Sequence, residues 1–167
     1  MIPEILKNFN LFIDGRGHAG KVLEVTPPKL TIKTDEIQAG GMDVPVDIDM
    51  GMEKLSCDFT LAEYNADVLK LWGVSNGNAV KLTLRGAIQD DVGQVKPVTI
   101  TLQGLFKELD MGTWKPGEKT EKKCTVSCRY YKLAMEGETI YEIDAVNMVR
   151  IVGGKDQMAE IRSAIGV

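Results

Sequence analysis

Residues Lys54–Leu61 read KLSCDFTL, a stretch in which apolar and polar side chains alternate without a break. Strict alternation predicts a β-strand with one buried face and one polar face. Such one-sided burial is typical of antiparallel sheets, because parallel sheets are usually covered on both faces. The two faces of this strand carry Leu55, Cys57, Phe59 and Leu61 on one side and Ser56, Asp58 and Thr60 on the other.

The same alternation continues on both sides of this stretch. It predicts further strands over residues 10–15, 29–34, 79–88 and 97–106, and a long hairpin over 123–135 and 139–152. Helical spacing replaces it at 65–73, where Asn65 is the predicted N-cap, and at 156–166, where Asp156 is the predicted N-cap. We therefore predict a mainly β fold, a β-sandwich or barrel-like fold with one or two short flanking α-helices.

The composition is that of a single domain spanning residues 1–167. Hydrophobic residues make up 44% and charged residues 26% of the chain, an ordinary balance for a globular protein. The net charge of -4 argues against a protein that binds nucleic acid tightly, since phosphate binding needs a concentrated basic face. It does not exclude a protein along which nucleic acid passes without being bound. We find neither a long apolar run nor a signal-peptide pattern, and expect the chain to stay in the cytoplasm where it is made.

Residues suited to catalysis or metal binding are few. The single histidine, His18, lies in a glycine-rich turn; it is either a base or ligand or, as we favour, a solvated turn residue. Cys57, Cys124 and Cys128 alternate with apolar residues, which indicates small buried side chains rather than a zinc site. The acidic stretch that begins at Asp47 does not have the spacing of a calcium loop. We predict no catalytic, cofactor or metal site, and a protein that is not an enzyme.

The segment just before the alternating strand, residues 39–55, reads AGGMDVPVDIDMGMEKL. It is long for a connection, and its valines, isoleucine and methionines are too apolar for a solvated loop. We predict a long extended loop at about 38–54. An apolar segment must be covered, and composition leaves open whether its own sheet or a neighbouring molecule covers it.

Several segments together resemble one known family. They are MIPEILKNFNLFIDGRGHAGKV at the start, GGMDVPVDIDMGMEKL, LRGAIQD, LQGLFKELDMGTWKPGEK and YYKLAMEGETIYEIDAVNMVRIVGGKDQ. Nearly end to end, they are similar to the major tail tube protein of contractile-tailed bacteriophages. The tube protein of R-type pyocins is similar too, and the type VI secretion tube protein is a more distant relative.

The resemblance implies a structural role in the inner tube of a contractile phage tail or phage-tail-like particle. Members of the family form hexameric rings that stack into a hollow conduit for DNA delivery or membrane puncture. The implied partners are further copies of the chain, the tail sheath protein, and the baseplate and tail terminator proteins. Phage DNA passes through without specific binding, and no stable membrane association is expected. Assembly takes place in the bacterial host cytoplasm, and the product is part of the virion tail.

Carried over to this chain, the resemblance implies three groups of site residues. Residues of the extended loop become ring-stacking contacts: Met42, Asp43, Val44, Pro45, Val46, Asp47, Ile48, Asp49 and Met50. Other interface candidates are Pro3, Leu6, Phe9, Trp114 and the C-terminal helix. The polar faces of the strands beside the loop are candidates for lining the bore: Thr31, Lys33, Ser56, Asp58 and Thr60.

Alternative functions remain open at this stage. One is a tube subunit of a type VI-like secretion system, which belongs to the same structural class. Another is a β-barrel protein that binds a small ligand in its interior, and a weaker one is a metal-assisted hydrolase that uses carboxylates and His18. The sequence also leaves open whether the particle is an infectious phage or a bacteriocin, how long the tube is, and which bacterium it meets.

Overall fold

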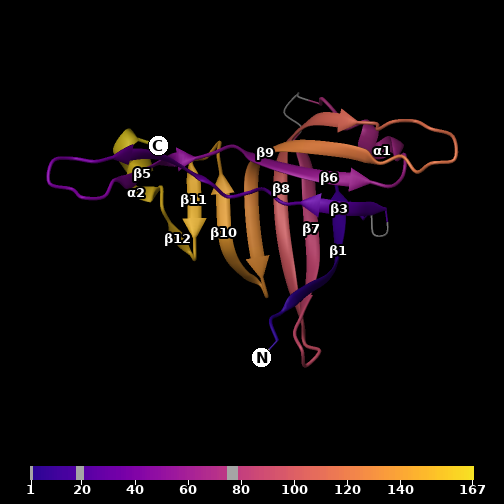
Figure 1. Cartoon of the computed structure of the whole chain (residues 1–167), viewed down its shortest axis with the longest axis horizontal. Coiled ribbons are helices and arrows are strands. Elements are labelled where there is room, and N and C mark those ends of the chain that lie inside the picture. The colour runs from indigo at the N-terminus through magenta and orange to yellow at the C-terminus, as the bar shows by residue number, and fades with distance from the viewer. Residues whose placement is uncertain (1, 18–20, 75–78) are drawn as a thin grey trace.

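The computed structural model describes residues 2–17, 21–74 and 79–167. Antiparallel strands and two short helices make up the molecule, which confirms the predicted mainly β fold (Figure 1). The helices are α1 (Ala66–Leu69) and α2 (Ala159–Ile165). The strands are β1 (Ile5–Ile13), β2 (Arg16–Gly17), β3 (Val22–Thr26), β4 (Ile32–Ile37), β5 (Val46–Met52), β6 (Leu55–Leu61), β7 (Val80–Gln89), β8 (Val95–Asp110), β9 (Lys122–Met135), β10 (Glu138–Asp144), β11 (Val149–Val152) and β12 (Lys155–Asp156).

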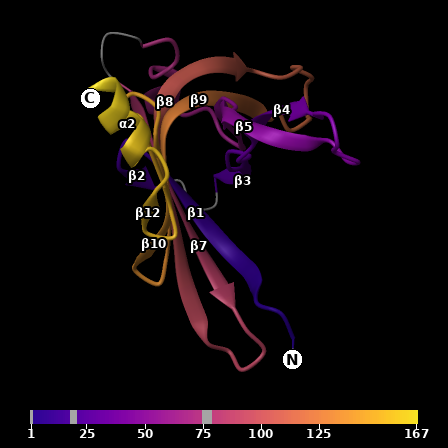
Figure 2. The ribbon, with the colours of Figure 1, turned by 90° about the vertical axis from the view of Figure 1, so that its left-hand side faces the viewer.

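Two layers share the long strands β8 and β9. The main sheet runs in the order β12-β11-β10-β9-β8-β7-β1-β2. The small sheet consists of β3, β6 and the first half of β9, together with the end of β8 that pairs with it. Strand β9 changes partner along its length, because Lys122–Cys128 pairs with β6 whereas Tyr130–Met135 pairs with β10. Figure 2 shows β8 and β9 curving from one layer into the other.

The bend in β8 and β9 depends on a close approach of their backbones at Gly104. The pairing register shifts between Gln103 and Gly104 and again between Phe106 and Glu108, and such bulges bend a strand pair. A Cβ atom at Gly104 would lie 2.0 Å from the carbonyl oxygen of Ser127. Only glycine fits this approach, so Gly104 is what lets the two strands serve both sheets.

The hydrophobic core lies between the two sheets. The apolar face of the alternating strand, now β6, is buried as predicted, and the Phe59 ring meets the Phe106 ring edge-on at 6.0 Å between centroids. All three cysteines are buried in this core as free thiols, which confirms that prediction. Burial of this apolar surface is the main term that favours folding. Other fully buried members are Leu11, Ile13, Leu61, Leu82, Leu102 and Val126.

Several strand predictions differ from the structure. The strand predicted over 10–15 starts earlier, at Ile5, and ends at Ile13, and the one predicted over 97–106 extends from Val95 to Asp110. Residues 139–152, predicted as one strand, are divided into β10 and β11, because Asp144 Oδ1 accepts hydrogen bonds from the N–H groups of Val146 and Asn147 and folds the chain into a turn. Met148 completes this turn with a φ of 55°. The strand predicted over 29–34 starts only at Ile32 and runs on to Ile37, because it pairs with β5.

The two predicted helices are present but shorter than expected. Asn65 caps α1 as predicted, since its side-chain oxygen accepts a hydrogen bond from Asp67 N–H at 3.0 Å. The prediction that Asp156 caps α2 is wrong, because the N-cap is Met158. Asp156 instead accepts a hydrogen bond from Met158 N–H and pairs with Arg162 of the helix at 2.5 Å. No residue of α2 is buried in the isolated chain, so its apolar side chains are left for another contact.

Candidate functional site

The part of the chain that the structure describes offers little for catalysis. Among these residues, no group of three or more histidine, cysteine, aspartate or glutamate side chains could hold a metal ion, and no helix is long and apolar enough to cross a membrane. His18 lies outside the described residues. Burial raises the pKa of the Cys57 and Cys124 thiols to about 12 and that of Cys128 to about 11, so these thiols are protonated and unreactive at neutral pH.

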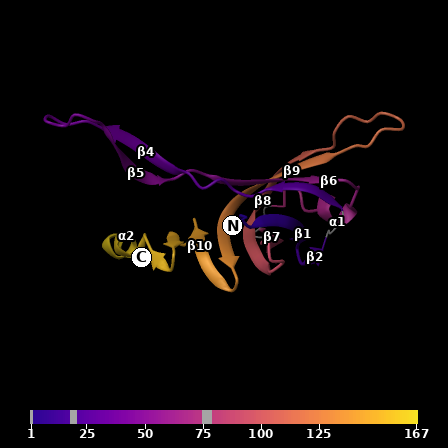
Figure 3. The ribbon, with the colours of Figure 1, turned by 60° about the horizontal axis from the view of Figure 1, so that its bottom comes forward.

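The most distinctive surface is a projecting hairpin, which we call the arm and define as residues 32–52. It consists of β4, the turn at 38–45 and β5, which pair only with each other in a separate two-stranded sheet. Figures 1 and 3 show the arm reaching outward beyond the main sheet. The segment predicted as an extended loop therefore contains a regular strand, Val46–Met52, together with the turn that precedes it.

One face of the arm is largely apolar, with Asp35 among its apolar side chains, and the other face is mainly acidic. Its register places Asp35 opposite Ile48 and Ile37 opposite Val46, whereas Thr34 lies opposite Asp49 and Glu36 opposite Asp47. Because side chains alternate between the two sides of a strand, the first set shares one face and the second set shares the other. The large apolar side chains of the first face are all exposed: Ile37 by 47%, Val46 by 48%, Ile48 by 43% and Met50 by 58%.

An ion pair shows which face of the arm looks toward the rest of the molecule. Arg150 Nη2 of β11 lies 2.9 Å from Asp49 Oδ2 on the acidic face. Since neighbouring residues of a strand point in opposite directions, Ile48 and Met50 point away from β11. The isolated chain therefore leaves the apolar face of its own arm uncovered.

The turn at the tip of the arm is held by local hydrogen bonds. Gln38 Nε2 donates to the carbonyl oxygen of Met42 at 3.1 Å, and Met42 N–H donates to Ala39 O at 3.1 Å. Gly41 takes a φ of 89°, which the turn requires. Val44, two-thirds exposed at the tip, continues the apolar character of the arm.

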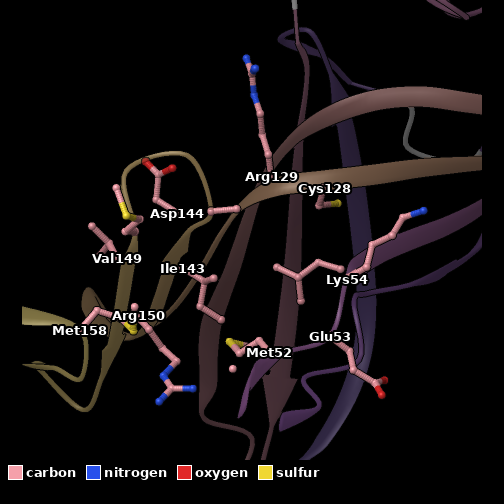
Figure 4. A pocket seen from close by; sticks show the side chains of 14 residues that line it. Met52, Glu53, Lys54, Cys128, Arg129, Ile143, Asp144, Val149, Arg150 and Met158 are labelled. Carbon is pink, nitrogen blue, oxygen red and sulfur yellow. The ribbon is translucent and has the colours of Figure 1, made fainter. Parts of the chain in front are cut away.

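A cavity of about 380 Å³ lies where the arm meets the body. Figure 4 shows Met52, Ile143 and Met158 around it, while the Arg129 side chain points away. The cavity is open to solvent at the end of the two layers, between the base of the arm and strands β10 and β11. Its lining is mostly apolar and includes Leu55, Met148 and Val149.

The main sheet presents a broad polar face opposite its core face. One row across the central strands reads Thr83, Thr101, Lys132, Glu142, with the apolar Phe12 and Ile151 at its two ends, and the adjacent row pairs Arg85 with Thr99. These threonines are half-buried, and Lys132 lies directly opposite Glu142 in the ladder. The sequence already shows this pattern as alternating threonines in two consecutive strands, but nothing in it indicates that the strands share one wide face.

The predicted bore-lining residues lie on different parts of the molecule and do not form one surface. Thr31 and Lys33 lie at the base of the arm, and Ser56 and Asp58 lie on the outer face of the small sheet, where Asp58 accepts a hydrogen bond from Thr125 at 2.6 Å. Thr60 is only 5% exposed in the isolated chain, with its hydroxyl 3.4 Å from Glu24. Pairing with β3 covers this end of β6.

The other predicted interface residues have different surroundings. Pro3 and Leu6 are exposed near the start of β1, and Phe9 is half-buried against the core of its own chain. Trp114 is 69% exposed and packs edge-on against Tyr64, with 5.9 Å between ring centroids. Trp114 and the start of β1 thus remain free for contact with another molecule, whereas Phe9 is partly used internally.

Both edges of the main sheet are incompletely paired within the described residues. At one edge β2 pairs only with Phe12 and Ile13, which leaves the outer side of Ile5–Leu11 unpaired. At the other edge β12 pairs only with Ile151 and Val152. Open strand edges attract further strands, so natural proteins normally cover or pair them.

Comparisons with known proteins agree with these features. The sequence model of the family described as phage tail tube protein FII matches residues 3–166. The chain is 35% identical to the tail tube protein of Escherichia phage P2 over 170 aligned positions, with 99% of each chain covered. It is 32% identical to the major tail tube protein of Serratia phage KSP20, with 99% of this chain and 98% of the relative covered.

Solved structures share the fold at low sequence identity. A chain of the PVC sheath-tube complex, an extracellular contractile injection system in its extended state, superposes with a TM-score of 0.56 at 10% identity, covering 76% of this chain and 86% of that one. A chain of the anti-feeding prophage baseplate superposes with a TM-score of 0.50 at 11% identity, covering 75% and 90%. The fold, the end-to-end family match and the two phage relatives together show that this chain belongs to the phage tail tube protein FII family, whose members are structural components of the virion tail and not enzymes.

Proposed function

We propose that the chain builds the inner tube of a contractile tail by forming hexameric rings that stack into a hollow conduit. The observation that carries this proposal is the amphipathic arm, whose apolar face points away from the body that bears it. Four large apolar side chains exposed on one hairpin need a cover, and a second copy of the chain supplies it in a homo-oligomeric tube. We place the contacts from Met42 to Met50, predicted from the sequence, on this arm, and we add Ile37 to them.

The unpaired edges of the main sheet support closure into a ring. The edge at β1 and the edge at β12 lie at opposite ends of the strand order. A contact between two different surfaces of identical subunits closes into a ring when the rotation between neighbours fits. Joining β1 of one copy to β12 of the next would continue the main sheet around the ring and remove both open edges.

We infer that the polar face of the main sheet, rather than Thr31, Lys33 and Thr60, lines the bore. Its open edges lie at opposite ends of the strand order, so its polar face would continue from subunit to subunit when these edges join. The face is rich in threonine, and Lys132 of β9 lies directly opposite Glu142 of β10 in the strand register. Such a lining mixes hydroxyl groups with charges of both signs and has no concentrated basic patch, which favours transit of DNA over binding.

The remaining partners follow from the same proposal. A tube in a contractile tail is surrounded by the sheath protein and ends on baseplate and tail terminator proteins. One structural neighbour belongs to a sheath-tube complex and another to a baseplate, which supports these partners at the level of shared fold. The exposed apolar residues of α2 and Trp114 are our candidates for such contacts and for contacts between copies.

Negative-stain electron microscopy of the concentrated protein tests the proposal. We expect rings or tubes with an open bore, and an elution volume in size-exclusion chromatography that depends on concentration. Deleting residues 42–49 should leave the circular dichroism spectrum of a β protein and stop tube growth, since the deleted part of the arm makes no contact with the core. A chain that stays monomeric at high concentration, or a deletion variant that grows normal tubes, would contradict the assembly role of the arm.

A further inference from the structure

Asp49 is placed differently from the other acidic residues of the arm, because both of its carboxylate oxygens are engaged. Oδ1 accepts a hydrogen bond from the backbone N–H of Gly51 at 2.8 Å, within the arm itself. Oδ2 accepts one from Arg150 Nη2 at 2.9 Å, across to strand β11. Asp47, two residues earlier on the same face, makes no such contact among the described residues.

Apart from Met52, which packs against the core at the end of β5, the arm has few other connections to the body. Its base is closed by Glu53 N–H, which donates to Thr31 O at 2.9 Å, and beyond this the chain simply continues into its flanking segments. Within the described residues, the Asp49–Arg150 contact is the one side-chain hydrogen bond or ion pair that joins the arm to another strand of the molecule. Gly51 lies directly after it, with a φ of 101° and open space around the position of a Cβ atom. Because glycine carries no Cβ atom, the backbone at this point is less restricted than at a residue with a side chain.

Arg150 gives the contact a firm anchor. Its side chain is only 18% exposed, and its stem lines the cavity at the base of the arm (Figure 4). Its backbone is held in the ladder opposite Ile143, and its carbonyl oxygen accepts a hydrogen bond from Gln157 N–H at 2.7 Å. The guanidinium group thus extends from the main sheet to the base of the arm.

We propose that Asp49 is a positioning residue, and that its contact with Arg150 is a strut that sets the angle at which the arm presents its apolar face to the next copy. This inference rests on the proposed function for its consequence in assembly. It also changes the role predicted for Asp49 from the sequence, from a contact with the neighbouring ring to a contact within the subunit. The contact with Gly51 fixes the rotamer of the carboxylate, and Arg150 fixes its distance from β11.

The expected effect is moderate because the pair is partly exposed. Ion pairs of this kind shift an equilibrium by about two- to fivefold. Asp49→Asn is the most informative change, since the amide oxygen still accepts the hydrogen bond from Gly51 while the charge is lost. Arg150→Met removes the charge from the other side and keeps an apolar stem in the cavity. The matched controls are Asp47→Asn on the same face of β5 and Arg150→Lys, which keeps a cation opposite Asp49.

Two measurements test the strut separately from tube formation. In dilute protein, spin labels at Val44→Cys on the arm tip and Lys155→Cys on β12 report the distribution of distances by pulsed electron paramagnetic resonance; the native cysteines are buried and will not be labelled. In unlabelled protein, light scattering gives the critical concentration for assembly. We expect Asp49→Asn and Arg150→Met to broaden the distance distribution and raise the critical concentration about two- to fivefold. Both controls should behave like the natural chain.

The outcomes distinguish the strut from the proposed function. A distance distribution unchanged by Asp49→Asn overturns the strut, whether or not tubes form. A broader distribution with an unchanged critical concentration also overturns it, because the angle of the arm would then not matter for assembly. If the natural chain forms no tubes while Asp49→Asn loosens the arm, the tube proposal fails and the intramolecular strut is supported.

Discussion

Replacing Val46 and Ile48 by threonine tests whether the apolar face of the arm is the contact between subunits. Threonine keeps the branched shape and strand preference of these residues but removes apolar surface. Val46 is 48% and Ile48 43% exposed in the isolated chain. Complete burial of such a side chain is worth about 1.5–3 kcal/mol, so covering the exposed half contributes about 1 kcal/mol for each. Loss of both contributions, about 2 kcal/mol, corresponds to a roughly 30-fold increase in the critical concentration for assembly.

Light scattering across a concentration series measures this critical concentration, and urea unfolding of the dilute chain serves as the stability control. The free energy of unfolding should change by no more than about 0.5 kcal/mol, because the two residues are on the surface of the monomer. Thr34→Ser, on the opposite face of β4, should leave both quantities unchanged. A doubly substituted chain that folds and assembles at the natural concentration would show that another surface, not this face of the arm, joins the subunits.

Two further predictions concern the fold. Gly104→Ala should lower the free energy of unfolding in urea by about 3 kcal/mol or more, because its Cβ would lie 2.0 Å from Ser127 O and cannot be accommodated without moving the backbone. Gly40→Ala, with open space around its Cβ, is the control. Equal stability of the two variants would contradict the close approach of the strands at Gly104. A thiol reagent at pH 8 should modify no cysteine in the folded protein and all of them in urea. Burial raises the pKa of each thiol in the folded chain above the ordinary value of 9.0. The contribution of the thiols to the free energy of unfolding is therefore complete below about pH 9 and is lost as pH rises toward 12. Rapid modification of the folded chain would contradict the burial of the thiols.

Alternation along the chain was sufficient to predict the strands that form the core. The strand from Leu55 to Leu61 has its predicted faces because each apolar residue finds a partner layer at the same spacing. Alternation does not predict the division of residues 139–152 into two strands. That division depends on a single side chain, Asp144, whose hydrogen bond to the following backbone competes with strand pairing. The role of Asp156 is not predictable from capping rules, which consider only neighbouring backbone groups. Its partner Arg162 lies six residues later, inside α2.

The candidate site was only partly predictable from the sequence. The apolar character of the arm is visible in its composition, but its two faces depend on the register between β4 and β5, which no local pattern specifies. The contact of Asp49 with Arg150 joins residues 101 positions apart. The broad polar face likewise depends on the order of strands in the main sheet, which brings Thr83, Thr101 and Lys132 into one row.

The passage of β8 and β9 from one sheet into the other has a mechanical consequence. In a sandwich whose layers touch only through side chains, a force on one layer reaches the other through dispersion contacts, which yield by sliding. Here two continuous backbones cross between the layers at Gly104, so tension or compression is carried by covalent bonds and by the ladder between the two strands. A subunit built in this way deforms as one elastic body, which suits the tube that we propose it builds.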